Sequence, residues 1–393
     1  MTAFLLRNPR IVLPFFHHQN AFFSSSANAT ASTPIVSRRR FRSAIVSSSD
    51  PERIFSMLYS SDLLLQNRET ANIAVSKISR RGRRDLVEKL LEPVRLRSDN
   101  DEKGFIRVMW LYSSAGMVEH ALKTFDEIPS RTEKSVCALL GVYLDNHLPG
   151  RAREFFTRVP EEIQIVPGIS SWNLYLKALC DDGEITTAAE LVLGKLHAEN
   201  NIEPGIISHN ILLDACLKTG DQSGFDAIIQ GITRKGLQHD AVTYNSRITM
   251  LCGNKNNPCE AEKLFDEMLS KGLKPNSVSY NTLLTGFCKN GELMSGVRWF
   301  NRMRDKNMVD GGSFVMVMKL MVEKGEMTQA VNICKECLGK KWAPPFYVIR
   351  TMVDGLVKDS MVKEARCVVE MMKDCVKGPA LMAWIKFESA LPL

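Results

Sequence analysis

The sequence predicts an all-α fold in which helix-turn-helix units of about 35 residues stack into a solenoid. Three observations carry this prediction: a turn residue that recurs every 31 to 37 residues, apolar residues at helical spacing on both sides of each turn, and apolar columns that continue from unit to unit. The turn residues are Gly82, Gly116, His147, Gly183, Gly220, Asn256, Gly291, Gly325 and Ser360. One such unit cannot bury its apolar face alone, so neighbouring units must pack together.

Each unit is predicted to be two helices around its turn. The run before a turn places apolar residues three and four positions apart, as in Tyr280, Leu283 and Phe287, and the run after it does likewise, as in Ala261 and Phe265. A glycine between two such runs favours the left-handed backbone that ends a helix. Two columns are therefore expected in the core: Leu176, Leu213, Ile248, Leu284, Met318 and Val353, and Ala121, Ala152, Ala188, Ala261, Ala330 and Ala365.

The ends of the solenoid can also be predicted. Asp50 before Pro51 is typical of a helix start, with Asp50 as the capping residue. The segment from Trp384 to Leu391 is expected to be a closing helix, because solenoids need a capping element. We therefore expect a solenoid of about nine repeats over residues 50–393, with a C-terminal capping helix.

Residues 1–49 have a different composition. They contain six arginines, many serines and no acidic residue, which is typical of an organelle transit peptide that is removed on import and has no fixed structure. Mitochondrion is the favoured destination, with plastid as the alternative. Without these six arginines the 51 basic residues become 45, against 44 acidic residues, so bulk charge gives no argument for nucleic-acid binding. No apolar stretch is long enough to span a membrane.

The sequence offers no convincing catalytic, metal or cofactor site. His197 and Glu199, with Cys334 and Cys337, resemble fragments of a zinc deaminase site, but the two fragments are 137 residues apart and lack the Pro-Cys phrase. A single pair of cysteines in a helix is a weak zinc signal. The ten cysteines are not expected to form a disulfide framework in this compartment. We therefore predict no enzyme activity, no cofactor and no small-molecule substrate.

Four phrases carry a family resemblance. They are Val242 to Asn245, Phe265 to Met268, Gly272 to Asn276 and Val278 to Leu284. These phrases resemble the pentatricopeptide repeat consensus, and on them the chain is identified as a P-class member of the plant organellar type. The resemblance covers roughly residues 66–380, with the best matches over 169–310, and implies a right-handed superhelix. The tetratricopeptide alternative would need Trp and Leu-Gly landmarks that are missing here.

The family resemblance implies that each repeat reads one base of single-stranded RNA. An apolar residue near the repeat start would stack on the base, and the Asn of Tyr-Asn with the last residue of the repeat would address its edge. Carried over by residue, the stacking side chains are Ile207, Val242 and Val278. The base-reading side chains are Asn173, Asn210, Asp240, Asn245, Asn276, Asn281 and Asp310. The three complete sets imply a pyrimidine core, 5′-U-(C/U)-U-3′.

The same residues have a plainer structural interpretation. Asparagine at a helix start often caps or bridges helices, and Ile207, Val242 and Val278 could be simple core. The remaining repeats depart from the family pattern and are expected to read no base. Their corresponding pairs are Ile106 with Thr132, Cys137 with Gly168, and Val315 with Pro345, and Arg350 has no clear partner.

Three functions remain open from the sequence. The first is an organellar single-stranded RNA-binding protein acting in RNA stability, processing or translation. The second is a mitochondrial ribosome-associated repeat protein whose partners are rRNA or ribosomal subunit proteins; the near-neutral body and the short code favour it. The third is a protein scaffold with no RNA role, which the recurring Asn and Asp residues argue against.

Overall fold

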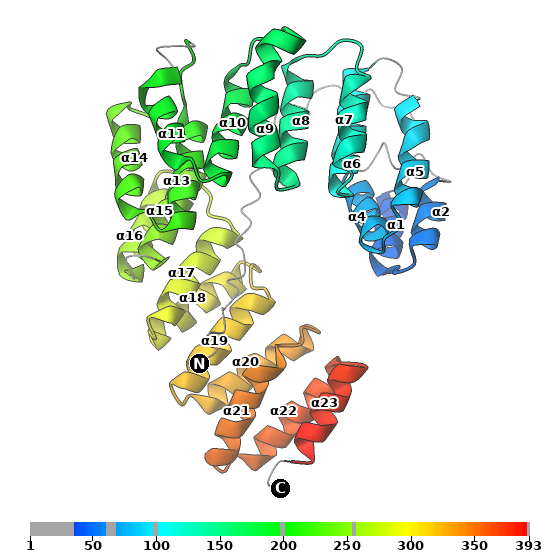
Figure 1. Ribbon diagram of the computed structural model, residues 1–393. Helices are drawn as coiled ribbons and strands as arrows, with labels where there is room; N and C mark the ends of the chain where they lie inside the picture. Colours follow the sequence, from blue (N-terminus) through cyan, green and yellow to red (C-terminus); the bar gives the residue numbers. More distant parts are fainter. Residues whose placement is uncertain (1–34, 60–67, 97–100, 197–200, 254–256, 391–393) are drawn as a thin grey trace, which may run out of the picture. The chain divides into compact units, whose positions relative to one another are not determined.

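Every regular element in the described residues is helical, as predicted (Figure 1). The computed structural model describes residues 35–59, 68–96, 101–196, 201–253 and 257–390. They belong to two compact units, one of residues up to 97 with 114–117, the other of 98–113 with 118 onwards. The first unit contains α1 (Ile35–Ser47), α2 (Pro51–Tyr59), α4 (Arg68–Arg80) and α5 (Arg84–Leu96).

The second unit is a series of helical hairpins. Its amino-terminal helices are α6 (Glu102–Ser114), α7 (Val118–Asp126), α8 (Glu133–Asp145), α9 (Pro149–Arg158), α10 (Ile169–Asp181) and α11 (Ile185–Glu190). The central ones are α13 (Ile206–Thr219), α14 (Gln222–Arg234), α15 (Ala241–Gly253), α16 (Pro258–Ser270), α17 (Ser277–Lys289) and α18 (Leu293–Asp305). The last are α19 (Gly311–Glu323), α20 (Met327–Gly339), α21 (Phe346–Lys358), α22 (Val362–Cys375) and α23 (Pro379–Glu388).

The predicted turn residues adopt the left-handed backbone. Positive φ angles of 58° to 90° occur at Gly82, Gly116, His147, Gly183, Gly220, Gly291, Gly325 and Ser360. This backbone stops a helix and reverses the chain, which glycine does without strain. Asn256 lies outside the described residues. A second set of left-handed residues, at Gly236, Gly272, Asn307 and Lys341, ends the second helices and was not singled out from the sequence.

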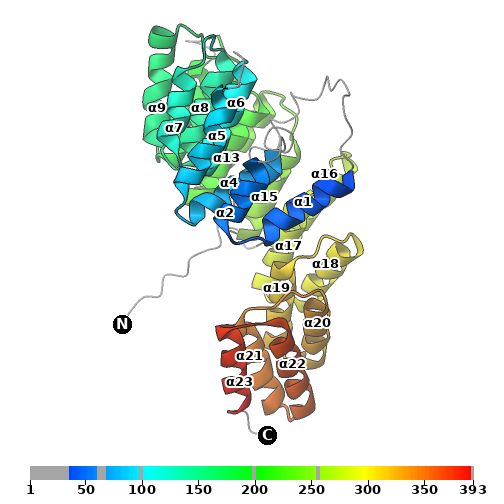
Figure 2. The same ribbon diagram turned by 90° about the vertical axis from the view of Figure 1, so that its right-hand side faces the viewer.

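Consecutive hairpins stack through their first helices. We call the helix before each turn the first helix and the helix after it the second helix. Each of α8, α10, α13, α15, α17 and α19 contacts the first helix of the following hairpin. Figures 1 and 2 both show α21, α22 and α23 side by side at the carboxyl end. The prediction of a solenoid of helix-turn-helix repeats is confirmed.

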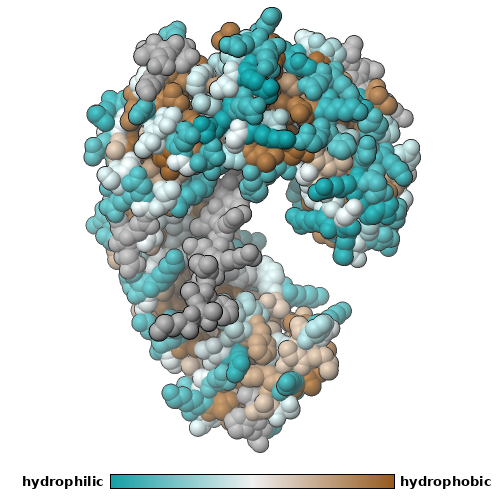
Figure 3. All heavy atoms as spheres, in the orientation of Figure 1, coloured by the Kyte–Doolittle hydropathy of each residue, from teal (hydrophilic) through white to brown (hydrophobic). Residues whose placement is uncertain are grey.

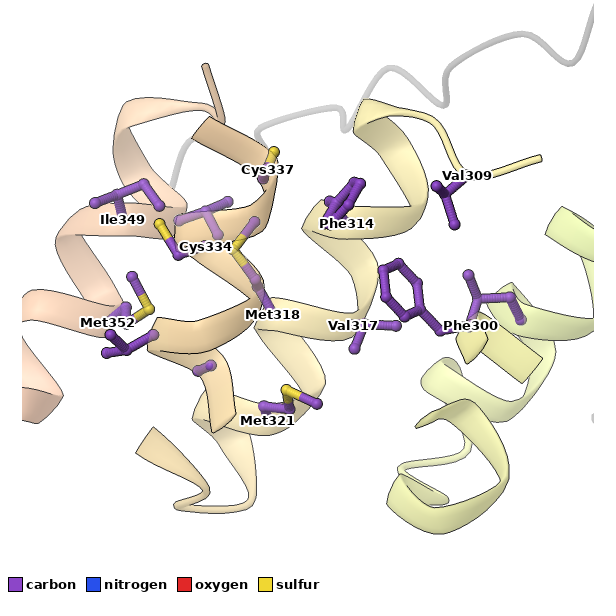
Figure 4. Close-up of a cluster of buried hydrophobic side chains, with 14 of the residues drawn as sticks. Phe300, Val309, Phe314, Val317, Met318, Met321, Cys334, Cys337, Ile349 and Met352 are labelled. Carbon is purple, nitrogen blue, oxygen red and sulfur yellow. The ribbon is translucent and has the colours of Figure 1, made fainter. Parts of the chain in front are cut away.

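The hydrophobic core runs through the stacked hairpins without a break from Ile248 to Trp384. Figure 4 shows part of it, where Phe300, Phe314 and Val317 lie against each other and Cys334 faces Met352. Both columns predicted from the sequence are fully buried: Leu176, Leu213, Ile248, Leu284, Met318 and Val353, with Ala121, Ala152, Ala188, Ala261, Ala330 and Ala365. Small alanines on the second helix allow the two helices of a hairpin to approach closely.

Irregular spacings have local causes. The shortest interval, from Gly116 to His147, contains α7, which has 9 residues where α16 has 13. Two of the longer intervals each contain a π-helical turn, at Val159–Ile163 and at Leu191–Lys195. The unequal spacings of the turns therefore leave the hairpin order unchanged.

Part of the predicted transit segment is helical. Residues up to 34 lie outside the described residues, but α1 packs on α4 and buries Ile45 completely. Lys77 Nζ on α4 donates hydrogen bonds to the backbone oxygens of Ile45 at 3.0 Å, Ser48 at 2.8 Å and Val46. The ammonium group thus satisfies carbonyls at the carboxyl end of α1. The expectation of no fixed structure is wrong for residues 35–47, and the transit role stays a prediction.

Both predicted end helices are present. The backbone nitrogen of Glu52 donates to Asp50 Oδ1 at 3.1 Å, so Asp50 caps α2 as expected. The closing helix α23 begins at Pro379, five residues before Trp384, and its Trp384 is 2% exposed. None of the described helices is long and apolar enough to cross a bilayer. In Figure 3, hydrophilic residues cover much of the visible surface, and hydrophobic residues form patches between them.

Candidate nucleic-acid interface

The predicted base-reading residues gather at the amino ends of the first helices. The last residue of one repeat is the N-cap of the next first helix, and the asparagine is the fifth residue of a first helix. Asn276 Oδ1 accepts from the backbone nitrogens of Val278 and Ser279, and Asp310 Oδ1 accepts from that of Ser313. We call the surface formed by the second and fifth residues of the first helices the reader face.

Two of the three complete sets bring their base-reading residues into direct contact. Asn210 Nδ2 lies 3.0 Å from Asp240 Oδ1 and 3.2 Å from Asp240 Oδ2. Asn281 Nδ2 lies 3.3 Å from Asp310 Oδ2. An amide and a carboxylate that are about 30 residues apart in sequence therefore form one polar pair at the boundary between two repeats.

The asparagines also bridge adjacent repeats through their side-chain oxygen. Asn173 Oδ1 accepts from Ser208 Oγ at 2.7 Å, and Asn210 Oδ1 accepts from Thr243 Oγ1 at 2.8 Å. Asn245 Oδ1 accepts from Ser279 Oγ at 2.6 Å. We call these three contacts the amide ladder. The bridging role considered from the sequence is thus present, and it occupies the oxygen of each amide and leaves its NH₂ group for other partners.

The amide ladder ends at α17. The hydroxyl of Ser313 donates to Asp310 instead, and Asn281 Oδ1 is buried with no hydrogen-bond partner among the described residues. In the middle set, Asn276 uses Oδ1 as a helix cap, and its contact with Asn245 is not among the hydrogen bonds of the described residues. The residues of the three sets therefore occupy the same positions in their repeats, but their polar atoms form different hydrogen bonds.

The predicted stacking residues are outside the buried core. Ile207 is 49% exposed, and Val242 and Val278 are partly exposed on the same helical face as the asparagines. Asn173, Asn210 and Asn245 are 7%, 2% and 7% exposed. The reader face therefore combines accessible apolar side chains with polar groups set slightly below them.

Two buried side chains next to the reader face, His209 and Tyr244, are held uncharged or hydrogen-bonded. His209 takes the position that Tyr244 has in the following repeat; its Nδ1 lies 2.8 Å from the oxygen of Gly205, and burial lowers the pKa of its imidazole. Tyr244 donates to Glu267 Oε1 at 2.7 Å. Hydrogen bonds from Lys271 and Tyr244 lower the pKa of Glu267.

Two glutamates with a structural role were not found from the sequence. Glu133 Oε1 accepts from the backbone nitrogens of Gly168 at 3.0 Å and Ser171 at 3.2 Å, and from Ser171 Oγ at 2.9 Å. Glu102 Oε1 accepts from the backbone nitrogen and the hydroxyl of Thr132, both at 2.8 Å. Both lie at the first position of a first helix; Glu133 caps the next first helix, and Glu102 holds Thr132, the residue that caps α8. The regular recurrence of Ser or Thr at the third position of the first helices was the only sequence signal that pointed to a side-chain acceptor there.

Three degenerate repeats have Ile106, Cys137 or Val315 where the others have asparagine, and a fourth has Arg350. Val315 is half-buried and packs against the core, and Ile106 is also half-buried. Burial raises the pKa of Cys137 to about 12, so its thiol stays protonated. Cys334 and Cys337 are buried on α20, and His197 and Glu199 lie outside the described residues. Among the residues described, no three His, Cys, Asp or Glu side chains are placed to hold a metal ion.

Three family models match the chain. The model described as PPR repeat family matches residues 239–289 and 275–309, and the one described as Pentatricopeptide repeat domain matches 191–255. The model described as PPR repeat matches 107–132 and 350–375. The matched ranges include every residue of the three complete sets except Asp310, which lies one residue beyond the match that ends at 309.

Similar curated proteins come from Arabidopsis thaliana. A mitochondrial pentatricopeptide repeat-containing protein is 24% identical over 99% of this chain and 94% of its own length. The small ribosomal subunit protein mL103 (rPPR7) is 24% identical over 95% of this chain and 93% of its length. The small ribosomal subunit protein mS79 (rPPR3b) is 28% identical, with 49% of this chain and 50% of that protein covered.

The fold also matches a solved structure. The pentatricopeptide repeat protein PPR10 from maize, in complex with an 18-nucleotide psaJ RNA element, superposes with a TM-score of 0.53 at 18% identity. The match covers 90% of this chain and 59% of that one. At this level of identity the likeness establishes a common fold.

Proposed function

The chain belongs to the pentatricopeptide repeat family, and from this premise we propose that it is a P-class organellar protein that binds single-stranded RNA on its reader face. Each complete repeat reads one base by stacking and by edge recognition, and the protein acts in the stability, processing or translation of a transcript. We propose no enzyme activity for it.

The observation that carries this proposal is the contact between Asn210 and Asp240. The two predicted base-reading residues of one repeat lie within hydrogen-bond distance, and Asn281 and Asp310 repeat the arrangement. Helix capping alone requires the carboxylate but not the asparagine beside it. The pairing therefore supports a two-residue device at each repeat boundary.

This pair has the chemistry to recognise uracil. Uracil offers an N–H donor flanked by carbonyl acceptors, whereas the pair offers the amide NH₂ of Asn210 and the carboxylate of Asp240. The oxygen of Asn210 is held by Thr243, which fixes the amide orientation so that the NH₂ group faces Asp240. The neutral pair of Asn245 and Asn276 lacks a carboxylate, which fits acceptance of either pyrimidine.

A test replaces a base-reading aspartate without removing the helix cap that it also provides. Asp240→Asn and Asp310→Asn keep a capping oxygen, because asparagine caps helices as well as aspartate does. We expect the wild-type protein to prefer RNA with the core U-(C/U)-U over a purine core, and each variant to accept C as readily as U at its own position. The measurement is the affinity for labelled oligonucleotides that differ in the base at each of the three core positions. The proposal is refuted if the wild-type protein shows no base preference, or if the Asp→Asn variants keep the wild-type preference.

Mitochondrion is the proposed compartment. The arginine-rich, acid-free first 49 residues support import into an organelle, and the similar protein of nearly equal length is named as mitochondrial. A fluorescent fusion of the full chain that accumulated in plastids would overturn this assignment.

A second candidate function is a component of the mitochondrial ribosome. The relatives mL103 and mS79 are named as small ribosomal subunit proteins, and the first matches nearly the whole chain. Three complete reader sets also define a short site, as expected of a protein held mainly by other contacts. Sedimentation of organelle lysate separates the two functions: persistence in a subunit peak after RNase treatment favours the ribosomal role, and release favours transcript binding.

A further inference from the structure

The reader face changes its chemistry after α17. The fifth position, asparagine on α10, α13, α15 and α17, becomes Val315 on α19 and Arg350 on α21. The second position becomes Gly312 and then Tyr347. The amide and carboxylate pair is therefore absent from both repeats, although their helices continue the same stack.

Tyr347 presents an accessible aromatic ring on this face. It is 56% exposed, and the ammonium group of Lys319 lies 4.7 Å from its ring centroid. Lys319 is an exposed residue of α19, one turn after Val315, so the contact joins adjacent first helices. A cation beside an exposed ring is attracted to its face and leaves room for a second aromatic group to stack.

Arg350 adds a second cation one turn beyond Tyr347. Its side chain is 60% exposed, and its Nε lies 3.7 Å from Asp354 Oδ2, which is 57% exposed. Such an exposed pair contributes little, so a phosphate can compete for the guanidinium group. Lys177, at the corresponding position of α10 to Lys319, pairs with Asp181 at 3.0 Å, whereas Lys319 has no ion-pair partner among the described residues.

We propose that Lys319, Tyr347 and Arg350 form a second kind of RNA contact, which stacks one nucleotide and holds its phosphates without reading the base. The inference rests on the proposed function and extends it to repeats without the code. It predicts that these three residues bind the second nucleotide on the 3′ side of the U-(C/U)-U core.

Single-stranded RNA is the partner that this chemistry favours. An open ring provides stacking for any base, and two cations provide charge for the backbone. The three residues also continue the reader face, so an RNA held at Asn281 would meet them next. A protein partner is the competing possibility, and the test below distinguishes it.

The test measures binding of a labelled oligonucleotide that carries the core and four further 3′ nucleotides. An abasic ribose at the second nucleotide after the core should weaken binding to the wild type about tenfold, and exchange of its base should change binding less than about twofold. In Tyr347→Leu the abasic ribose should have no further effect. Tyr347→Phe keeps the ring and should behave as the wild type.

The cations are tested by the dependence of binding on salt. Lys319→Gln with Arg350→Gln should lower the slope of log affinity against log salt by about 0.7 for each phosphate that the protein no longer neutralises. Lys363→Gln with Arg366→Gln, both exposed on α22, removes the same charge away from the reader face and should leave the slope unchanged.

The outcomes separate this inference from the proposed function. If the wild-type protein bound no RNA, the proposed function itself would fail. If it bound the core selectively and the abasic ribose weakened Tyr347→Leu as much as the wild type, only the second kind of RNA contact would be refuted. Unchanged RNA binding in Tyr347→Leu and in Lys319→Gln with Arg350→Gln would likewise overturn it and leave the surface to a protein partner.

Discussion

The amino-terminal and central repeats of the second unit are joined by different polar contacts. Glu102 and Glu133 reach from one first helix to the start of the next, whereas Asn173, Asn210 and Asn245 form the amide ladder. The glutamates use their charge entirely within the protein. The asparagines use their oxygen to bridge repeats and keep their NH₂ group on the reader face, where that of Asn210 donates to Asp240. Under the proposed function, structural bridging and RNA recognition share one side chain only in the central repeats.

The largest effect is expected from Glu133→Ala. It leaves the backbone nitrogens of Gly168 and Ser171 without this acceptor, and the Ser171 hydroxyl keeps only the backbone oxygen of Gly168; bonds to a charged acceptor are strong. We expect a loss of about 3 kcal/mol in unfolding free energy, measured by urea denaturation, with RNA affinity unchanged. The exposed Glu161→Ala is the control and should be neutral. A clear fall in RNA affinity in Glu133→Ala would contradict the division of roles.

Asn210→Ala and Asn281→Ala sharpen the comparison within the central repeats. Asn210 holds Thr243 and Asp240, whereas the oxygen of Asn281 has no partner among the described residues. Removing Asn210 should cost about 2 kcal/mol of stability, and removing Asn281 less than about 1 kcal/mol. Both should weaken binding of the U-(C/U)-U oligonucleotide to a similar degree. Equal stability losses would show that the amide ladder contributes nothing.

A third effect depends on pH and concerns His209, which takes the position that Tyr244 has in the following repeat. Burial lowers the pKa of His209 below its ordinary value of 6.5, so the unfolded chain takes up this proton at a higher pH than the folded one. Stability should therefore fall as pH decreases from about 7.5 to about 5.5. His209→Phe should reduce that fall, as followed by thermal unfolding at several pH values. If the variant kept the full pH dependence, other histidines would be responsible.

Much of the fold was predictable because each turn and each apolar column is a local signal. Gly183 and Gly220 mark helix ends by backbone preference alone, and Leu176 and Leu213 mark the core by helical spacing. The predicted base-reading asparagines recur at the same position of successive first helices for the same reason, and their role stays a prediction. Their contacts were not predictable, since the partner of Asn210 depends on how two hairpins stack.

The two glutamates mark the limit of such inference. Glu133 lies in a stretch that has diverged from the family pattern, and the recurring Ser or Thr at the third helix position does not by itself indicate that this carboxylate reaches Gly168 and Ser171 in the next repeat. The helix α1 was missed for a related reason. Its composition is that of a transit peptide, whereas the contacts that order it come from Lys77, some 30 residues later.

The smallest expected effect compares the two glutamates with each other. Glu102 accepts from the exposed Thr132, whereas the donors to Glu133 are partly buried. Because water can replace an exposed acceptor, Glu102→Gln should lower the unfolding free energy by about 0.5 kcal/mol. Glu133→Gln should lower it several times more. Urea denaturation of both Gln variants in parallel provides the measurement. If Glu102→Gln were the more damaging, burial of the capped helix start would not determine the strength of these contacts.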